Sequence, residues 1–139
     1  MFINNVGPYG VVKRKVMVID CDVDVTFSVK RILEDTGVFE VDAFNVPAQA
    51  LSSFVINSYD VVILDVKMRD MDGFRLYKKI KLLNKKVRVC FLNSVFDFSP
   101  YIAIYPDILE TIEDNGDRIL DKPVGSKRLI REINKLNST

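Results

Sequence analysis

Apolar residues along the chain fall into short continuous runs that alternate with segments of helical spacing. Short apolar runs are typical of buried strands, and apolar positions three or four residues apart are typical of amphipathic helices. Strands are predicted at residues 15–20, 38–44, 60–65, 87–93 and 118–121. Helices are predicted at residues 24–36, 47–57, 73–83, 107–114 and 126–136. The pattern is least clear in the rest of the segment 94–117.

The helical spacing also predicts which side chains face the core. They are Phe27, Ile32 and Leu33 in the first helix, Leu76, Ile80 and Leu83 in the third, and Leu129, Ile130, Ile133 and Leu136 in the last. Lysines occupy the opposite side of the third helix, which favours an exposed face there.

Strand–helix alternation predicts an α/β fold, a doubly wound five-stranded parallel sheet with helices on both faces. We expect one domain over residues 15–136. Residues 1–14 are expected to form an N-terminal arm, because Gly7, Pro8 and Gly10 interrupt regular structure. In open sheets of this kind ligands bind beyond the carboxyl ends of the strands.

Composition and charge exclude several functions. The chain has 139 residues, a net charge of +1 and no histidine. The charge gives no electrostatic case for binding nucleic acid or an anionic membrane, and no apolar run approaches the roughly 20 residues of a membrane span. Catalysis or metal binding by histidine within this chain is excluded. Cys21 and Cys90 lie in apolar runs, which predicts reduced, buried thiols in a cytoplasmic protein.

Polar residues stand at the ends of four predicted strands. They are Asp20, Asp22, Asp65, Asn93, Ser94 and Lys122. Two carboxylates about 4 Å apart repel by roughly 4 kcal/mol at an effective dielectric constant near 20, and either Mg²⁺ or a lysine would relieve that repulsion. A carboxylate such as Asp65 can accept a phosphoryl group as an acyl phosphate. Lys122 and a side chain at position 93 or 94 would then contact the phosphoryl oxygens.

Each of these residues also has an ordinary structural interpretation. Asp20 and Asp22 are suited to the N-terminus of the following helix, as cap and first-turn acids. Asp65 is suited to an ion pair with Lys122. Two further acids after Asp65, at positions 70 and 72, are interpreted as turn and cap residues.

Four stretches resemble the receiver domain of two-component response regulators. They are VMVIDCDVD, YDVVILDVKMRDMDG, VRVCFLNS and ILDKPV, and they lie within residues 15–136. The resemblance implies a flavodoxin-like strand order 2-1-3-4-5 and phosphorylation of Asp65 by a histidine kinase. It also implies that Lys122 contacts the phosphoryl group, and that Mg²⁺ is held by the first-strand acids, by Asp65 and by the backbone carbonyl of Lys67.

Four positions depart from the family pattern. Cys21 stands where the family has its second acid, and a thiol is a poor ligand for Mg²⁺, so either Asp22 reaches the metal or the affinity falls. Arg69 replaces a loop proline. Asn93 replaces the hydroxyl-bearing switch residue, although its amide can still donate to a phosphoryl oxygen. Ile119 replaces the switch aromatic.

The expected function is that of a stand-alone receiver, because only three residues follow Leu136. Its expected partners are a histidine kinase or phosphotransfer protein, a downstream protein, and a second copy of the chain in a homodimer. The alternative is a pseudo-receiver that binds partners without phosphorylation. An enzyme is not expected, because Lys67 stands two residues after Asp65, where phosphatases with an aspartyl nucleophile often carry a second acid.

The segment 94–117 is several residues longer than is usual in the family and is rich in aromatic residues. Phe96, Phe98, Tyr101 and Tyr105 are expected either to form an exposed contact surface or to pack in the core beneath the long loop.

Overall fold

The computed structural model describes residues 12–94 and 98–136, which form a single five-stranded sheet with helices on both faces. The strands are β1 (Arg14–Ile19), β2 (Phe39–Phe44), β3 (Val61–Leu64), β4 (Arg88–Asn93) and β5 (Arg118–Asp121). The helices are α1 (Val23–Glu34), α2 (Pro47–Ile56), α3 (Gly73–Leu83), α4 (Ser99–Ile104), α5 (Ile108–Asp114) and α6 (Ser126–Leu136).

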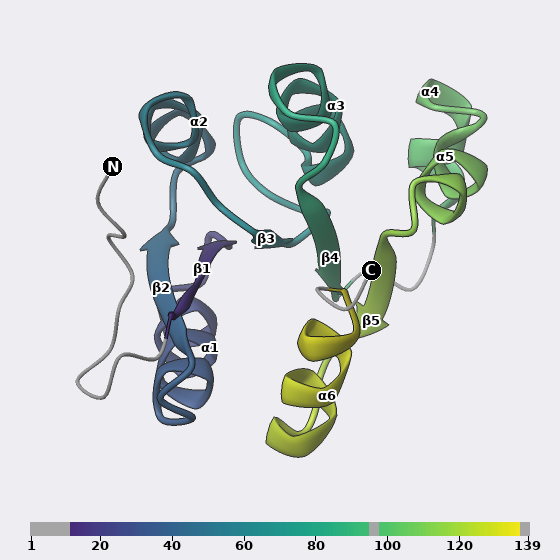
Figure 1. Cartoon of the computed structure of the whole chain (residues 1–139). Helices are drawn as coiled ribbons and strands as arrows, with labels where there is room; N and C mark the ends of the chain where they lie inside the picture. The colour runs from purple at the N-terminus through teal and green to yellow at the C-terminus, as the bar shows by residue number, and fades with distance from the viewer. Residues whose placement is uncertain (1–11, 95–97, 137–139) are drawn as a thin grey trace.

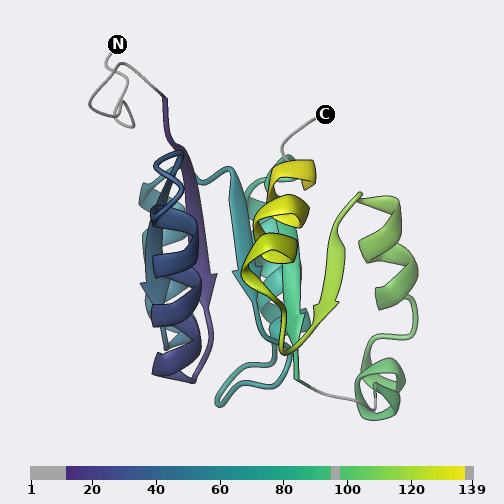
Figure 2. The ribbon, with the colours of Figure 1, turned by 90° about the horizontal axis from the view of Figure 1, so that it is seen from below.

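The strands are all parallel and lie in the order β2-β1-β3-β4-β5, which confirms the predicted doubly wound sheet. Ile19 pairs with Leu64, and Asn93 pairs with Asp121. The carboxyl ends of the strands therefore meet at one edge of the sheet, toward which the arrowheads point in Figure 2. All four residues of β3 are buried, as expected of the central strand.

Two apolar cores lie on opposite faces of the sheet. Alternate residues of each central strand face opposite sides, so Val62 and Leu64 belong to one core, whereas Val61 and Ile63 belong to the other. Helices α1 and α6 cover one face, and α2 and α3 cover the other (Figure 1). Cys90 is buried in the core beneath α1 and α6, as predicted.

Two predictions of inward-facing side chains were wrong. Phe27 is 62% exposed, and the buried positions of α1 are Thr26, Val29 and Leu33. The polar Thr26 can be buried because its hydroxyl donates to the Val23 carbonyl. Leu83 is 54% exposed because it lies in the last turn of α3, past the last buried position of that helix.

The segment after β4 contains two helices, of which the sequence predicted only the second. Helix α4 was missed, whereas α5 lies within one residue of its predicted start. Phe98, Tyr101 and Tyr105 are half-buried and pack against the core that contains Phe74. They therefore form neither a fully exposed contact surface nor a fully buried part of the core, the two arrangements that were expected. Phe96 lies outside the described residues.

Most of the predicted N-terminal arm, residues 1–11, also lies outside the described residues, and Arg14 already belongs to β1. Within the described ranges, no helix combines the length and the apolar character that a bilayer span requires.

Candidate functional site

Two buried carboxylates stand side by side at the carboxyl edge of the sheet. Asp65 directly follows β3, Asp20 directly follows β1, and both residues are 4% exposed. The pairing of Ile19 with Leu64 places them at the same level on neighbouring strands. The Asp65 backbone N–H donates to the Ile19 carbonyl, which extends the pairing to the acid itself.

Lys122 supplies the positive charge that compensates these acids. Its ammonium nitrogen lies 2.5 Å from Asp20 Oδ2 and 3.6 Å from Asp65 Oδ2. The lysine follows β5, and its backbone N–H donates to the carbonyl of Asn93 at the end of β4. Asn93 itself is buried. The carboxyl ends of β1, β3, β4 and β5 thus lie together at this site.

The environment of Asp65 disfavours its charge. Burial raises the pKa of Asp65 above its ordinary value, and the neighbouring Asp20 raises it further. Lys122 and the backbone N–H groups of Val66 and Ser94 lower it, but they do not offset the burial. The Val66 N–H lies 2.9 Å from Asp65 Oδ1. Additional positive charge at this edge would therefore stabilise the ionised carboxylate.

The loop after Asp65 returns to pack against the backbone of the acid. The Gly73 N–H donates to the Val66 carbonyl at 2.7 Å, and a Cβ atom on Gly73 would lie only 2.0 Å from the Asp65 carbonyl oxygen. Asp72 caps α3 by accepting from the Arg75 N–H, as the sequence predicted. Asp70 lies in the turn with a φ of 64°. The first turn of α3 is thus in direct contact with Asp65.

Asp22 and Cys21 lie at the border of the acid pair. Asp22 is exposed and caps α1, because its Oδ1 accepts from the Asp24 N–H. Its own N–H donates to Asp20 Oδ1. Cys21 lies in the loop after β1 and is half-buried, which corrects the prediction of a buried thiol in a strand. Its sulfur accepts from the Arg69 N–H at 3.3 Å, so the thiol contacts the loop that carries Lys67.

One further residue at this edge, Asn45, was not predicted from the sequence. The Asn45 side-chain amide donates to the Asp20 carbonyl at 2.8 Å and to Thr26 Oγ1 at 3.0 Å. It therefore fixes the end of β1 to the first half of α1. A single asparagine after a strand is common in turns, so its position alone does not indicate this role.

This edge of the sheet offers a metal ion an incomplete set of hard oxygen ligands. The carboxylates of Asp20 and Asp65 suit Mg²⁺, but the Asp22 side chain is engaged in its cap and the Cys21 sulfur is a soft ligand. Within residues 12–94 and 98–136, no cluster of three or more acidic, cysteine or histidine side chains is arranged to hold a metal. Lys67 is exposed at the same loop.

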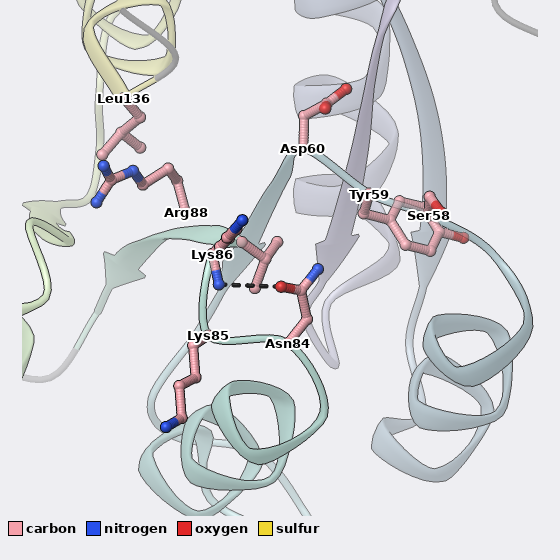
Figure 3. A pocket seen from close by; sticks show the side chains of 9 residues that line it. Ser58, Tyr59, Asp60, Asn84, Lys85, Lys86, Arg88 and Leu136 are labelled. Atoms are coloured by element: carbon pink, nitrogen blue, oxygen red, sulfur yellow. Dashed lines mark hydrogen bonds between the residues drawn. The ribbon is translucent and has the colours of Figure 1, made fainter. Parts of the chain in front are cut away.

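A hollow lies at the opposite edge of the sheet, away from the acid pair. It lies between the loops that precede β3 and β4, and Lys86, Arg88 and Asp60 line it (Figure 3). The Lys86 N–H donates to Asn84 Oδ1 there. The hollow contains none of the predicted site residues.

Comparison with known proteins agrees with this geometry. Residues 16–134 match the family description "response regulator receiver domain". The chain is 27% identical over 127 residues to the transcriptional regulatory protein LytR of Staphylococcus aureus, a match that covers 90% of the chain and 48% of LytR. It is 30% identical over 127 residues to the transcriptional regulatory protein PrrA of Mycobacterium tuberculosis, covering 91% of the chain and 51% of PrrA. The chain thus spans about half the length of the curated relatives it matches.

Solved structures show the same fold. The chemotaxis protein CheY4 of Vibrio cholerae superposes with a TM-score of 0.75 at 23% sequence identity, covering 89% of this chain and 98% of CheY4.

Proposed function

The chain belongs to the response regulator receiver domain family, and on that premise we propose that Asp65 accepts a phosphoryl group from a phosphohistidine. The donor would be a histidine kinase or a phosphotransfer protein of a two-component system. The observation that carries the proposal is the position of Asp65, buried at the end of the central strand beside Asp20 and Lys122.

The transfer makes one bond and breaks another. A carboxylate oxygen of Asp65 forms a P–O bond to phosphorus as the P–N bond to the donor imidazole breaks, and the electron pair of that bond stays on the imidazole, which takes up a proton. The product is an acyl phosphate on Asp65. Nothing is oxidised or reduced.

Lys122 is the residue placed to stabilise the transferred group. Its ammonium already lies within 3.6 Å of Asp65 and would attract the phosphoryl oxygens as they approach. We propose that the Asn93 amide, at the end of the neighbouring strand, donates to another of these oxygens. Both roles require the side chains to face the phosphoryl group once it is attached.

Receiver domains generally bind Mg²⁺ in the acidic pocket, where the ion neutralises charge on the phosphoryl oxygens. In this chain the carboxylates of Asp20 and Asp65 and the backbone carbonyl of Lys67 would hold it. Asp22 would contribute only by leaving its cap on α1. We propose that the affinity is reduced, because Cys21 offers sulfur in place of a carboxylate.

We propose that phosphorylation of Asp65 changes which proteins the domain binds, since receiver domains are signalling modules. The proposed location is the cytoplasm, where a two-component kinase would supply the phosphoryl group. The named relatives are transcriptional regulatory proteins about twice as long as this chain, so the output is proposed to arise by protein contact, from this domain alone or from a longer protein that contains it.

One observation favours a second candidate, the pseudo-receiver. The position that would carry a metal-binding acid is occupied by a thiol, and the Cys21 sulfur accepts from the Arg69 N–H of the phosphoacceptor loop. A domain without effective Mg²⁺ binding would bind its partner in one state only.

Incubation with acetyl phosphate separates the two candidates. A receiver gains a phosphoryl group that Mg²⁺ accelerates and that hydroxylamine removes, because hydroxylamine cleaves acyl phosphates. A folded protein that gains none with either acetyl phosphate or a phosphorylated histidine phosphotransfer domain is a pseudo-receiver.

A further inference from the structure

Helix α4 depends on contacts made by its side chains. It has six residues, none of them buried, and no side chain caps its first turn. A helix this short is unstable in isolation, because nucleation costs more than a few hydrogen bonds return. The position of α4 is therefore set by what its side chains contact.

Aromatic contacts hold α4 against the start of α3. Tyr101 and Tyr105 meet the Phe74 ring edge to face, with centroid distances of 5.6 Å and 6.2 Å. Phe98 lies 6.0 Å from the same ring. Phe74 is fully buried and directly follows Gly73, the residue that packs on the Asp65 carbonyl. The support for α4 is thus the part of α3 nearest to the phosphoacceptor.

A hydrogen bond joins α4 to the same loop. The Tyr105 hydroxyl, at the end of α4, donates to Asp72 Oδ2 at 3.0 Å. The other oxygen of Asp72 accepts from the Arg75 N–H at 2.9 Å. Asp72 therefore caps α3 and holds α4 with one carboxylate, and it is the immediate neighbour of Gly73.

The negative charges near the α4 tyrosines belong to Asp65 and to Asp72 in the loop that follows it. Burial raises the pKa of Tyr101, and Asp72 and Asp65 raise it further. Burial also raises the pKa of Tyr105, and so does Asp72. The positive charge of Arg75 lowers the pKa of Tyr105 in part, and the Lys78 ammonium lies 5.1 Å from the Tyr105 ring. A change of charge on Asp65 would therefore change the electrostatic environment of Tyr101 in α4.

We propose that Tyr105 is a positioning residue that couples the state of Asp65 to the position of α4 through its hydrogen bond to Asp72. The inference rests on the proposed function, phosphorylation of Asp65. A phosphoryl group adds negative charge beside the loop that carries Asp72, and like charges repel. Displacement of Asp72 breaks the bond to Tyr105 and frees α4 to present a different surface to a partner.

Hydrogen exchange of the α4 backbone amides, read by mass spectrometry, tests the coupling. The full chain, Tyr105→Phe and Tyr101→Phe are each measured with and without acetyl phosphate and Mg²⁺, and phosphoryl uptake is measured as intact mass on the same samples. Tyr101→Phe is the matched control, because it removes a hydroxyl from the same helix that makes no hydrogen bond within the described residues.

The expected result is a response that depends on one hydroxyl. In the wild type, phosphorylation accelerates exchange in α4 about three- to tenfold, the worth of one hydrogen bond. Tyr105→Phe takes up phosphoryl, exchanges fast in α4 before phosphorylation, and changes little after it. Tyr101→Phe responds as the wild type does. A purely structural role of Tyr105 would instead raise exchange equally in both states and preserve the response.

The remaining outcomes separate the two claims. Phosphoryl uptake with the same α4 response in wild type and Tyr105→Phe overturns this inference and leaves the proposed function standing. If none of the three folded proteins takes up phosphoryl from acetyl phosphate or from a phosphorylated histidine phosphotransfer domain, the proposed function is overturned, and the coupling with it.

Discussion

Lys122 lies closer to Asp20 than to Asp65: its ammonium nitrogen is 2.5 Å from the first carboxylate and 3.6 Å from the second. Both acids are buried, and the Lys122 ammonium forms an ion pair with each of them. The charge of Asp65 is less well compensated than that of Asp20, because Asp65 lies farther from the Lys122 ammonium. Burial keeps the pKa of Asp65 raised despite the lysine. The residue proposed to accept a phosphoryl group is therefore the one whose surroundings most favour additional positive charge.

Replacing Lys122 should show how much this compensation matters. In Lys122→Met the pKa of Asp65 is expected to rise further, because the lysine lowers it in the wild type. Phosphoryl uptake should slow about 100-fold, the usual cost of losing one stabilising group. Carbon-13 NMR titration of the carboxyl groups measures the first effect and intact mass over time the second. Lys122→Arg keeps the charge and should leave the Asp65 pKa close to its wild-type value. An unchanged Asp65 pKa in Lys122→Met would refute the electrostatic role.

Removing the charge of Asp65 should stabilise the protein at neutral pH. Because the pKa of Asp65 is raised in the folded protein, the folded protein holds this proton more tightly than the unfolded chain does. Stability therefore falls as pH rises from about 3.8, the ordinary pKa of this carboxyl group, through the folded-state pKa. Asp65→Asn removes this loss. We expect its melting temperature to exceed that of the wild type by several degrees at pH 7, with the difference shrinking on acidification. A gain that persists undiminished at low pH would contradict this cause.

Gly73 should not tolerate any side chain. In Gly73→Ala the new Cβ would lie 2.0 Å from the Asp65 carbonyl oxygen and 2.8 Å from the Val66 Cα, and backbone atoms cannot move aside cheaply. We expect a loss of about 2 to 3 kcal/mol in the free energy of unfolding, although alanine is the better helix former. Gly125→Ala is the control, because a Cβ atom added at Gly125 would have nothing within 4 Å. Equal stability of the two variants in urea unfolding would show that the loop can withdraw from Asp65.

Position 21 should control metal affinity. Cys21→Asp replaces a soft sulfur ligand by a carboxylate beside Asp20, so Mg²⁺ should bind at least about tenfold more tightly. Isothermal titration calorimetry with MgCl₂ measures the change. Cys21→Ser, which adds no charge, should bind Mg²⁺ much as the wild type does. Unchanged affinity in Cys21→Asp would show that residue 21 lies outside the metal shell.

The sequence predicted the elements whose signals are long and regular. The continuous apolar run of β3 and the lysine-backed apolar face of α3 gave bounds within one residue of those observed. Because parallel strands end at one edge, the strand-end positions of Asp20, Asp65 and Lys122 were enough to predict that they meet, and the structure places them together.

What could not be predicted depends on tertiary contacts. Helix α4 has six residues and no side-chain cap, so it exists through its packing on Phe74, which no local pattern reveals. Spacing alone predicted that Phe27 faces inward. Thr26 takes the buried position instead, because its hydroxyl donates to the Val23 carbonyl and accepts from the Asn45 amide. The direction of the Asp22 side chain, toward the cap of α1, is likewise settled only in three dimensions.

The central claim, that Asp65 accepts the phosphoryl group, is tested most directly by intact-protein mass after incubation with acetyl phosphate and Mg²⁺. The wild type is compared with Asp65→Asn and with Asp70→Asn, which alters an exposed acid of the same loop whose φ of 64° suits asparagine. The account predicts a gain of one phosphoryl group in the wild type and in Asp70→Asn, and none in folded Asp65→Asn. Phosphoryl uptake that persists in Asp65→Asn would contradict it.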